Sequence, residues 1–172
     1  MSGPPIRSLL ALAAATAIAA PATAVAAPGQ TTSTVDVALL SPNTLQKLDD
    51  LDFGTIGQTA AGTAVIDPVA NSENATGGVL KLGGTPHSAR FQGVASKNSV
   101  VNIKLPNQPV TLTRSGGTQT LTVTNFTLDG PSKKVMASGN VFVIRVGATL
   151  TVPAGQATGL YTGTFNVTAQ YP

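Results

Sequence analysis

Residues 159–172 read GLYTGTFNVTAQYP, and this stretch is the clearest strand in the chain. Its even positions from 162 to 170 are polar, whereas its apolar and aromatic residues stand at odd positions: Tyr161, Phe165, Val167, Ala169 and Tyr171. A period of two places one face against a core and the other face in water. A strand that stands last in the chain either lies inside its sheet or leaves an open edge on which another segment can pair.

Shorter alternations of the same kind recur along the chain, and turn residues separate them about every eight to twelve positions. They lie at 34–40, 51–56, 62–67, 79–82, 101–105, 121–128 and 142–152. No segment after the first 26 residues shows a sustained helical period. The pattern predicts an all-β, antiparallel sandwich of about seven to ten short strands.

Breaks in these alternations predict three local features. Neighbouring apolar residues in opposite phases predict a β-bulge near Gly93 and a second bulge just before Phe126. The turn sequence PNQP at 106–109 predicts a hairpin in which 110–112 returns alongside 101–105.

The N-terminal residues have the composition of a secretory signal peptide. Arg7 is the only charged residue in 1–26, an Ala/Leu run follows it, and small residues end the segment. We expect 1–26 to be the signal peptide, 27–42 an N-terminal extension or first strand, and 43–172 the β-sandwich domain. The apolar run is shorter than the roughly 20 residues that a bilayer span requires, and no later segment approaches that length. The expected location is therefore the periplasm, the cell surface or the extracellular space, with no membrane span.

Charge and residue types argue against two classes of function. Without Arg7, nine Lys and Arg residues remain against seven Asp and Glu, which is too balanced for a nucleic-acid binder. His87 is the only histidine, the chain has no cysteine, and no G-x-S-x-G motif occurs. Asp49, Asp50 and Asp52 form the only acidic cluster, but the Ca²⁺-loop pattern is missing. We expect no enzymatic activity, no cofactor, no metal site and no nucleic-acid partner.

Three separated motifs resemble a known family. They are LDFG at 51–54, VGATLTV at 146–152 and GLYTGTF at 159–165, and in this order they resemble the bacterial secreted family named domain of unknown function 4402. That family is in turn similar to spore coat U and archaic chaperone–usher pilin domains. The resemblance implies an immunoglobulin-like, pilin-like sandwich that lacks its last strand. Gly159 and Tyr171 stand where pilins of that wider group carry a glycine and an aromatic residue, although the cysteine pair of many pilins is absent.

A sandwich that lacks a strand exposes an apolar groove, which an extended segment from a neighbour can fill. Residues 27–40 have the form of such a donor, with Val35, Val37 and Leu39 at period two. Burying three such side chains would contribute roughly 5 to 8 kcal/mol before ordering costs. The same alternation equally fits the domain's own first strand, inserted into its own sheet.

The expected function is that of an exported, non-enzymatic structural subunit of a fimbria-like surface assembly. Val35, Val37 and Leu39 are the predicted donor positions. The predicted acceptor positions on the last strand are Gly159, Tyr161, Phe165, Val167 and Tyr171. The expected partners are further copies or related subunits, with a periplasmic chaperone and an usher as candidates. The alternative is a self-complete secreted module that binds a glycan or surface polymer through its loops.

Overall fold

The computed structural model describes residues 44–137 and 140–172. The predicted signal peptide (1–26), the extension (27–42) and the donor positions Val35, Val37 and Leu39 lie outside this part. Within it, no helix occurs, and none is therefore long and apolar enough to cross a membrane.

Eleven strands make up the secondary structure of the described residues, three of them more than ten residues long. Their bounds are β1 (Leu45–Asp49), β2 (Thr55–Asp67), β3 (Ser72–Gly83), β4 (Ala89–Ala95), β5 (Val100–Lys104), β6 (Val110–Arg114), β7 (Thr120–Leu128), β8 (Lys133–Val135), β9 (Asn140–Val152), β10 (Tyr161–Thr162) and β11 (Thr168–Gln170).

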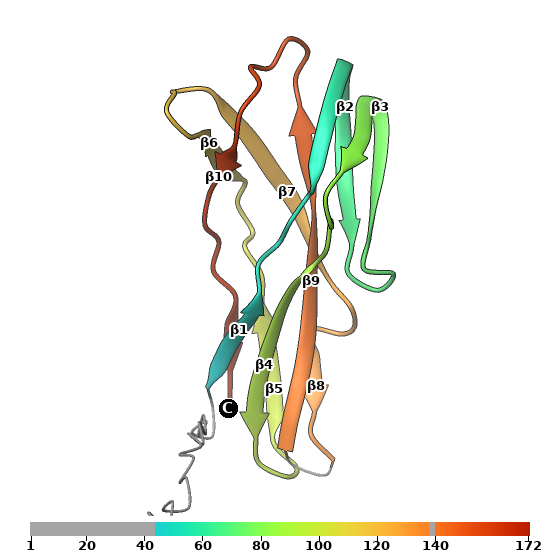
Figure 1. Cartoon of the computed structure of the whole chain (residues 1–172). Helices are drawn as coiled ribbons and strands as arrows, with labels where there is room; N and C mark the ends of the chain where they lie inside the picture. Colours follow the sequence, from blue (N-terminus) through green and yellow to red (C-terminus); the bar gives the residue numbers. More distant parts are fainter. Residues whose placement is uncertain (1–43, 138–139) are drawn as a thin grey trace, which may run out of the picture. The chain divides into compact units, whose positions relative to one another are not determined.

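The strands form two antiparallel sheets, which confirms the predicted all-β, sandwich-like fold class (Figure 1). The first sheet has the order β1-β4-β9-β7-β6-β10, and β2 joins it through β9 and carries β3. The second sheet has the order β11-β5-β8. β9 is central because it pairs with β2, β4 and β7. Its apolar residues at even positions from Phe142 to Val152 are all buried.

The buried side chains form two clusters, and one of them joins the two sheets. The lower cluster, near the C-terminus in Figure 1, joins Val101 and Ile103 of the second sheet to Phe142 and Ile144 of the first. The upper cluster comes from strands of the first sheet, which curls around it. Its buried members are Ala64, Val79, Leu121, Val123, Ala148, Leu150 and Val152.

One of the two predicted bulges is present. β7 and β9 shift register between Thr124 and Thr127, and Asn125 has a φ of 50° there, which confirms the bulge before Phe126. The bulge predicted near Gly93 is wrong, because β4 pairs with β9 without a shift from Ala89 to Ala95. Gly93 instead leaves room for the ring of Phe142, which a β-carbon at this position would strike.

The hairpin predicted through 106–109 is also wrong. β5 pairs with β8 and β11, whereas β6 pairs with β7 and β10. β5 and β6 are thus consecutive parts of one extended segment, and both pair with the C-terminal segment. Pro106 and Pro109 interrupt this extended segment, because proline has no N–H with which to donate a hydrogen bond to a neighbouring strand.

The C-terminal strand is correspondingly split into β10 and β11. Thr162 stands opposite Thr113, and Thr168 stands opposite Lys104. These two pairs are six residues apart in the C-terminal segment but nine residues apart in the segment from β5 to β6. The extra residues loop out around the prolines, and residues 163–167 have no ladder partner within the described chain.

Candidate strand-binding groove

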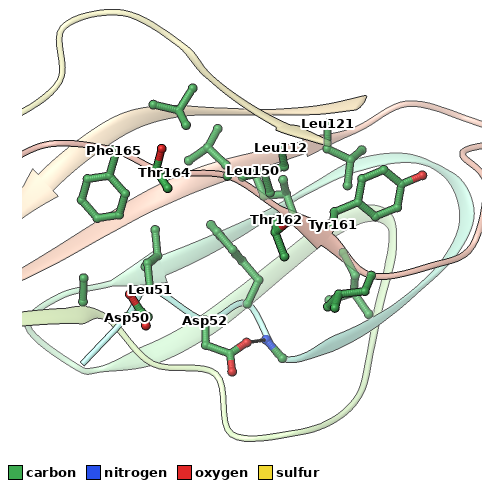
Figure 2. Close-up of a pocket in the computed structure, with 18 of the residues that line it drawn as sticks. Asp50, Leu51, Asp52, Leu112, Leu121, Leu150, Tyr161, Thr162, Thr164 and Phe165 are labelled. Atoms are coloured by element: carbon green, nitrogen blue, oxygen red, sulfur yellow. Dashed lines mark hydrogen bonds between the residues drawn. The ribbon is translucent and has the colours of Figure 1, made fainter. Parts of the chain in front are cut away.

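A groove of about 800 Å³ lies between the C-terminal segment and the chain that follows β1. One wall is formed by residues 159–165 and the other by residues 50–56. Figure 2 shows Tyr161, Thr162, Thr164 and Phe165 on the first wall, with Asp50, Leu51 and Asp52 across from them.

The floor of the groove is apolar. Its residues come from β6, β7 and β9, and they include Leu112, Leu121, Val123 and Leu150. Leu121, Val123 and Leu150 are buried members of the upper cluster, so the groove opens directly onto the core of the domain. An occupant would therefore add a further layer of side chains to that core.

Inward-facing side chains on both walls are only half-buried. The alternation predicted for the last strand holds in the structure, since residues at odd positions from Tyr161 to Tyr171, apart from Gly163, are half-buried and the even ones are exposed. On the opposite wall, Leu51, Phe53 and Ile56 also pack against the upper cluster without being fully covered. Large apolar side chains that point inward but stay partly exposed are typical of a site that binds another chain.

The predicted acceptor positions divide into two groups. Gly159, Tyr161 and Phe165 line the groove. Val167 and Tyr171 lie below it and pack against the lower cluster. The opposite wall was not predicted as part of a site, although residues 51–54 carried one of the family motifs.

The C-terminal segment presents an unpaired backbone edge to the groove. The carbonyl of Leu160 accepts a hydrogen bond from the Ser115 N–H at 2.8 Å, so Leu160 faces β6. Backbone groups of successive residues in an antiparallel strand point to opposite sides, and those of Tyr161 therefore point toward the groove. β10 also stands at the end of the first sheet, with no further described strand beyond it.

This edge lacks the charges that usually protect free strand edges. Residues 159–172 contain no Asp, Glu, Lys, Arg or His. Other terminal strands of the two sheets differ, because β1 has Lys47 and Asp49 and β8 has Lys133 and Lys134. Charged residues on an edge discourage pairing with another chain, so the C-terminal edge is the one left open to it.

Aromatic rings close the lower end of the groove. The Phe165 ring lies 5.0 Å from the Phe126 ring and 6.3 Å from the Phe91 ring, measured between centroids. Phe126 packs against the upper cluster and Phe91 against the lower one, so Phe165 lies where the two clusters meet. Below it, the Tyr171 hydroxyl donates to the Thr44 carbonyl at 3.2 Å, which brings the C-terminal segment up to the start of β1.

Polar contacts fix the upper end. The Tyr161 hydroxyl donates to the Ala157 carbonyl at 2.6 Å and accepts from the Gln156 amide at 2.8 Å. The backbone N–H of Gln156 in turn donates to the Gln58 side chain at 3.0 Å. Arg114 adds a hydrogen bond to the Thr158 carbonyl at 2.7 Å. These bonds hold the loop between β9 and β10 in place, so that the unpaired backbone edge begins at Tyr161.

The acidic residues beside the groove have partners within the chain. Asp50 pairs with Lys47 at 2.5 Å, and Asp49 pairs with Arg90 at 2.7 Å. Asp52 accepts a hydrogen bond from the Gly54 N–H at 2.7 Å, the dashed line in Figure 2. Among the described residues, no group of three or more His, Cys, Asp or Glu side chains is placed to hold a metal ion.

His87 is held by its backbone. It forms an isolated antiparallel bridge with Asp52, with N–O distances of 3.0 and 2.9 Å, and its side chain is half-buried. The bridge fastens the wall at 50–56 to the chain entering β4.

Alkaline pH is expected to destabilise the lower end of the groove, where Tyr171 contacts Thr44. Burial raises the pKa of the Tyr171 phenol above its ordinary value of 10.0. Below that value folded and unfolded chains both keep the proton, whereas above it the unfolded chain loses the proton first, so stability falls as pH rises. We expect the free energy of unfolding to fall more steeply above about pH 10 in the wild type than in Tyr171→Phe. Equal slopes in denaturation curves across this range would contradict the prediction.

Comparison with known proteins gives one match. A family model described as "Domain of unknown function (DUF4402)" matches residues 43–171, which include both walls and the floor of the groove. No curated protein matches the chain, and neither does any solved structure.

Proposed function

We propose that this chain, which belongs to the DUF4402 family, is an exported, non-enzymatic structural subunit of a cell-surface assembly, joined to its neighbours by β-strand complementation. In this function the groove accepts an extended segment that pairs with the free edge of β10. The further likeness to spore coat U and pilin domains belongs to the same proposal.

The observation that carries the proposal is an apolar groove beside an unpaired, uncharged strand edge. A strand laid in it would satisfy the outward backbone groups of Tyr161 and would cover Leu51, Phe53 and Ile56. Main-chain hydrogen bonds supply affinity in this mode of binding, while alternate side chains supply specificity. The floor of the groove has apolar side chains only, so it favours an occupant whose inward-facing side chains are apolar.

An exported subunit with such a groove needs protection before assembly. An exposed apolar surface next to a free strand edge is an aggregation hazard. We therefore include in the proposal a periplasmic carrier protein that covers the groove until the next subunit replaces it.

The proposal is tested by placing a charge in the groove. Leu51 is half-buried on the wall opposite the C-terminal segment, and Leu51→Arg would put a guanidinium where an incoming strand must pack. We expect the association constant, obtained from the multimeric fraction of the purified protein, to fall at least about tenfold, a change that corresponds to about 1.4 kcal/mol of association free energy. Light scattering after size-exclusion chromatography measures this fraction.

Leu82→Arg is the matched control. Leu82 is 65% exposed on β3 and lies outside the groove lining, so the same exchange should leave assembly unchanged. Thermal unfolding of both variants shows whether the domain still folds. A wild-type protein that stays monomeric when a chaperone and an usher are supplied would overturn the proposal, as would a folded Leu51→Arg variant that assembles normally.

A further inference from the structure

The interior strand β9 has an open stretch of backbone of its own. Over its upper half, β9 lies between β7 and β2. Over its lower half, β4 pairs with residues 140–146 (Figure 1), whereas the pairing with β7 ends at Leu128, opposite Val146. Beyond that point the chain leaves the first sheet and continues as β8 in the second. No described strand therefore lies beside residues 141–144 on the side that β7 occupies higher up.

One hydrogen bond shows which backbone groups point to this open side. The N–H of Asp129 donates to the Arg145 carbonyl at 3.1 Å, so the backbone groups of Arg145 point away from β4. Backbone groups of successive residues in an antiparallel strand point to opposite sides. Those of Val143 and Val141 therefore point the same way as those of Arg145. Within the described part of the chain, neither valine has a hydrogen-bond partner on that side.

The side chains along this edge are apolar and exposed. Val141 is 53% exposed and Val143 is 42% exposed, both on the outer face of β9. Val94 of β4 stands opposite Val141 and extends the same patch. Residues 140–144 contain no charge, whereas β8, at the end of the second sheet, carries two lysines. An uncharged edge with β-branched residues is a template on which another strand can pair.

We propose that this edge pairs with the same edge of a second copy, antiparallel and about a two-fold axis. The two open residues stand two positions apart, so one register satisfies both of them. In this register Val141 of each copy stands opposite Val143 of the other, and Phe142 lies at the axis with its backbone groups directed to β4. Two such pairs exchange roughly four hydrogen bonds in all, since each hydrogen-bonded pair shares two.

The shape and charge of the edge favour a second copy as its partner. The backbone of Asp129 occupies the place beside Arg145, so a long incoming strand would collide with it. The same short segment of a second copy fits the space that remains. Because the segment is uncharged, self-pairing sets no like charges against each other. The exposed patches of the two copies also join across the axis, where each Val141 contacts a Val143.

This contact is separate from the groove and does not rest on the function proposed above. Neither Val141 nor Val143 lines the groove. A two-fold contact uses the same surface on both copies and closes on itself, so it yields a dimer and no fibre. The paired strands are short, and interfaces below about 1,200 Å² are typical of weak complexes. We therefore expect a weak dimer that forms at high protein concentration and joins subunits side by side.

Engineered disulfides trap such a weak dimer, because the chain has no cysteine of its own. Full-length copies carrying Val141→Cys are mixed with mass-tagged full-length copies carrying Val143→Cys and then oxidised. Paired residues of this kind have Cα atoms about 5.5 Å apart, within reach of a disulfide. We expect linked pairs of one tagged and one untagged copy, with a yield about tenfold above that of the control.

The matched control is Val135→Cys, mixed with the same tagged partner. Val135 is 67% exposed and lies on β8, beside the two lysines of that strand. A second control is Val141→Cys alone. In the proposed register two such cysteines are diagonal neighbours about 7 to 8 Å apart, too far for an unstrained disulfide. Both controls should give the same low yield.

Three outcomes would overturn the inference. The first is a yield for the mixture no higher than that of Val135→Cys, and the second is equal linking by Val141→Cys alone. The third is loss of the link when both copies also carry Leu51→Arg, which blocks the groove, because the contact would then depend on assembly through the groove. A wild-type protein that does not assemble through the groove would overturn the proposed function alone.

Hydrogen exchange gives a second reading that needs no substitution. In wild-type protein the amide of Val143 should exchange more slowly as the protein concentration rises, because its N–H enters the new ladder. The amide of Ile144 points to β4 and should keep the same rate. Exchange at Val143 that does not change with concentration, up to the concentrations at which the disulfide forms, would also contradict the inference.

Discussion

Gly147→Ala is expected to destabilise the domain by at least about 3 kcal/mol, the largest effect that we foresee for the removal or addition of one methyl group. Gly147 is buried in β9, where a β-carbon would collide with the Ile66 carbonyl oxygen and would lie 2.6 Å from Cδ of Pro68. Neither neighbour can move aside easily, because Ile66 is fully buried and the oxygen belongs to the backbone. Denaturant unfolding followed by circular dichroism measures the change.

Gly130→Ala is the control for this prediction. A β-carbon at Gly130 would meet only the Lys134 ammonium at 3.7 Å, which is an ordinary contact. We expect a change within about 0.5 kcal/mol at this exposed position. A midpoint for Gly147→Ala equal to that of the wild type would show that β9 and the turn after β2 do not pack as described.

Phe165→Ala is expected to cost about 2 to 3 kcal/mol of unfolding free energy. The ring contacts those of Phe91 and Phe126 and lies between the two clusters, although it is only half-buried. Its loss would also extend the groove downward toward the lower cluster. The variant should therefore lose affinity for the next subunit beyond its loss of stability.

Two neighbouring exchanges make this prediction specific. Phe165→Leu keeps most of the apolar volume and should cost less than about 1.5 kcal/mol. Thr164→Ala changes an exposed side chain on the same segment and should change stability by no more than about 0.5 kcal/mol. If all three variants unfold at the same denaturant concentration, the Phe165 ring does not hold the clusters together.

Period-two patterns made the fold class predictable. The even positions of β9 and the odd positions of the C-terminal segment alternate over many residues, and burial alone determines their faces. The bulge before Phe126 was predicted from the same pattern, since the apolar residues of that strand change phase where β7 and β9 shift register. These features depend on local sequence and are visible without knowledge of the neighbours.

Predictions failed where a local signal has two tertiary meanings. A glycine in a strand marks either a bulge or room for a neighbour, and at Gly93 the neighbour is Phe142, far along the chain. Prolines between two apolar runs mark either a hairpin turn or a break within one extended segment. Here they mark a break, because the C-terminal segment pairs with β5 before the prolines and with β6 after them. Only the pairing partner decides between such alternatives.

The candidate site was half predictable. Tyr161 and Phe165 were identified from the period-two alternation of the C-terminal segment, and Gly159 from the family resemblance. The opposite wall at 50–56 was not, since most of it forms no continuous ladder and its apolar residues resemble ordinary core positions. The groove is defined by two walls that come together only in the fold, and such a juxtaposition of distant segments leaves no pattern in the sequence.

Amide hydrogen exchange on residues 161–165 tests the central claim most directly, comparing monomeric and assembled wild-type protein. The account predicts fast exchange in the monomer at Tyr161, whose backbone groups face the groove, and strong protection in the assembly. Amides at Thr113 and Thr122 in the paired interior ladder should be protected in both states. Assembled protein in which residues 161–165 still exchange as fast as in the monomer would contradict strand complementation at this edge.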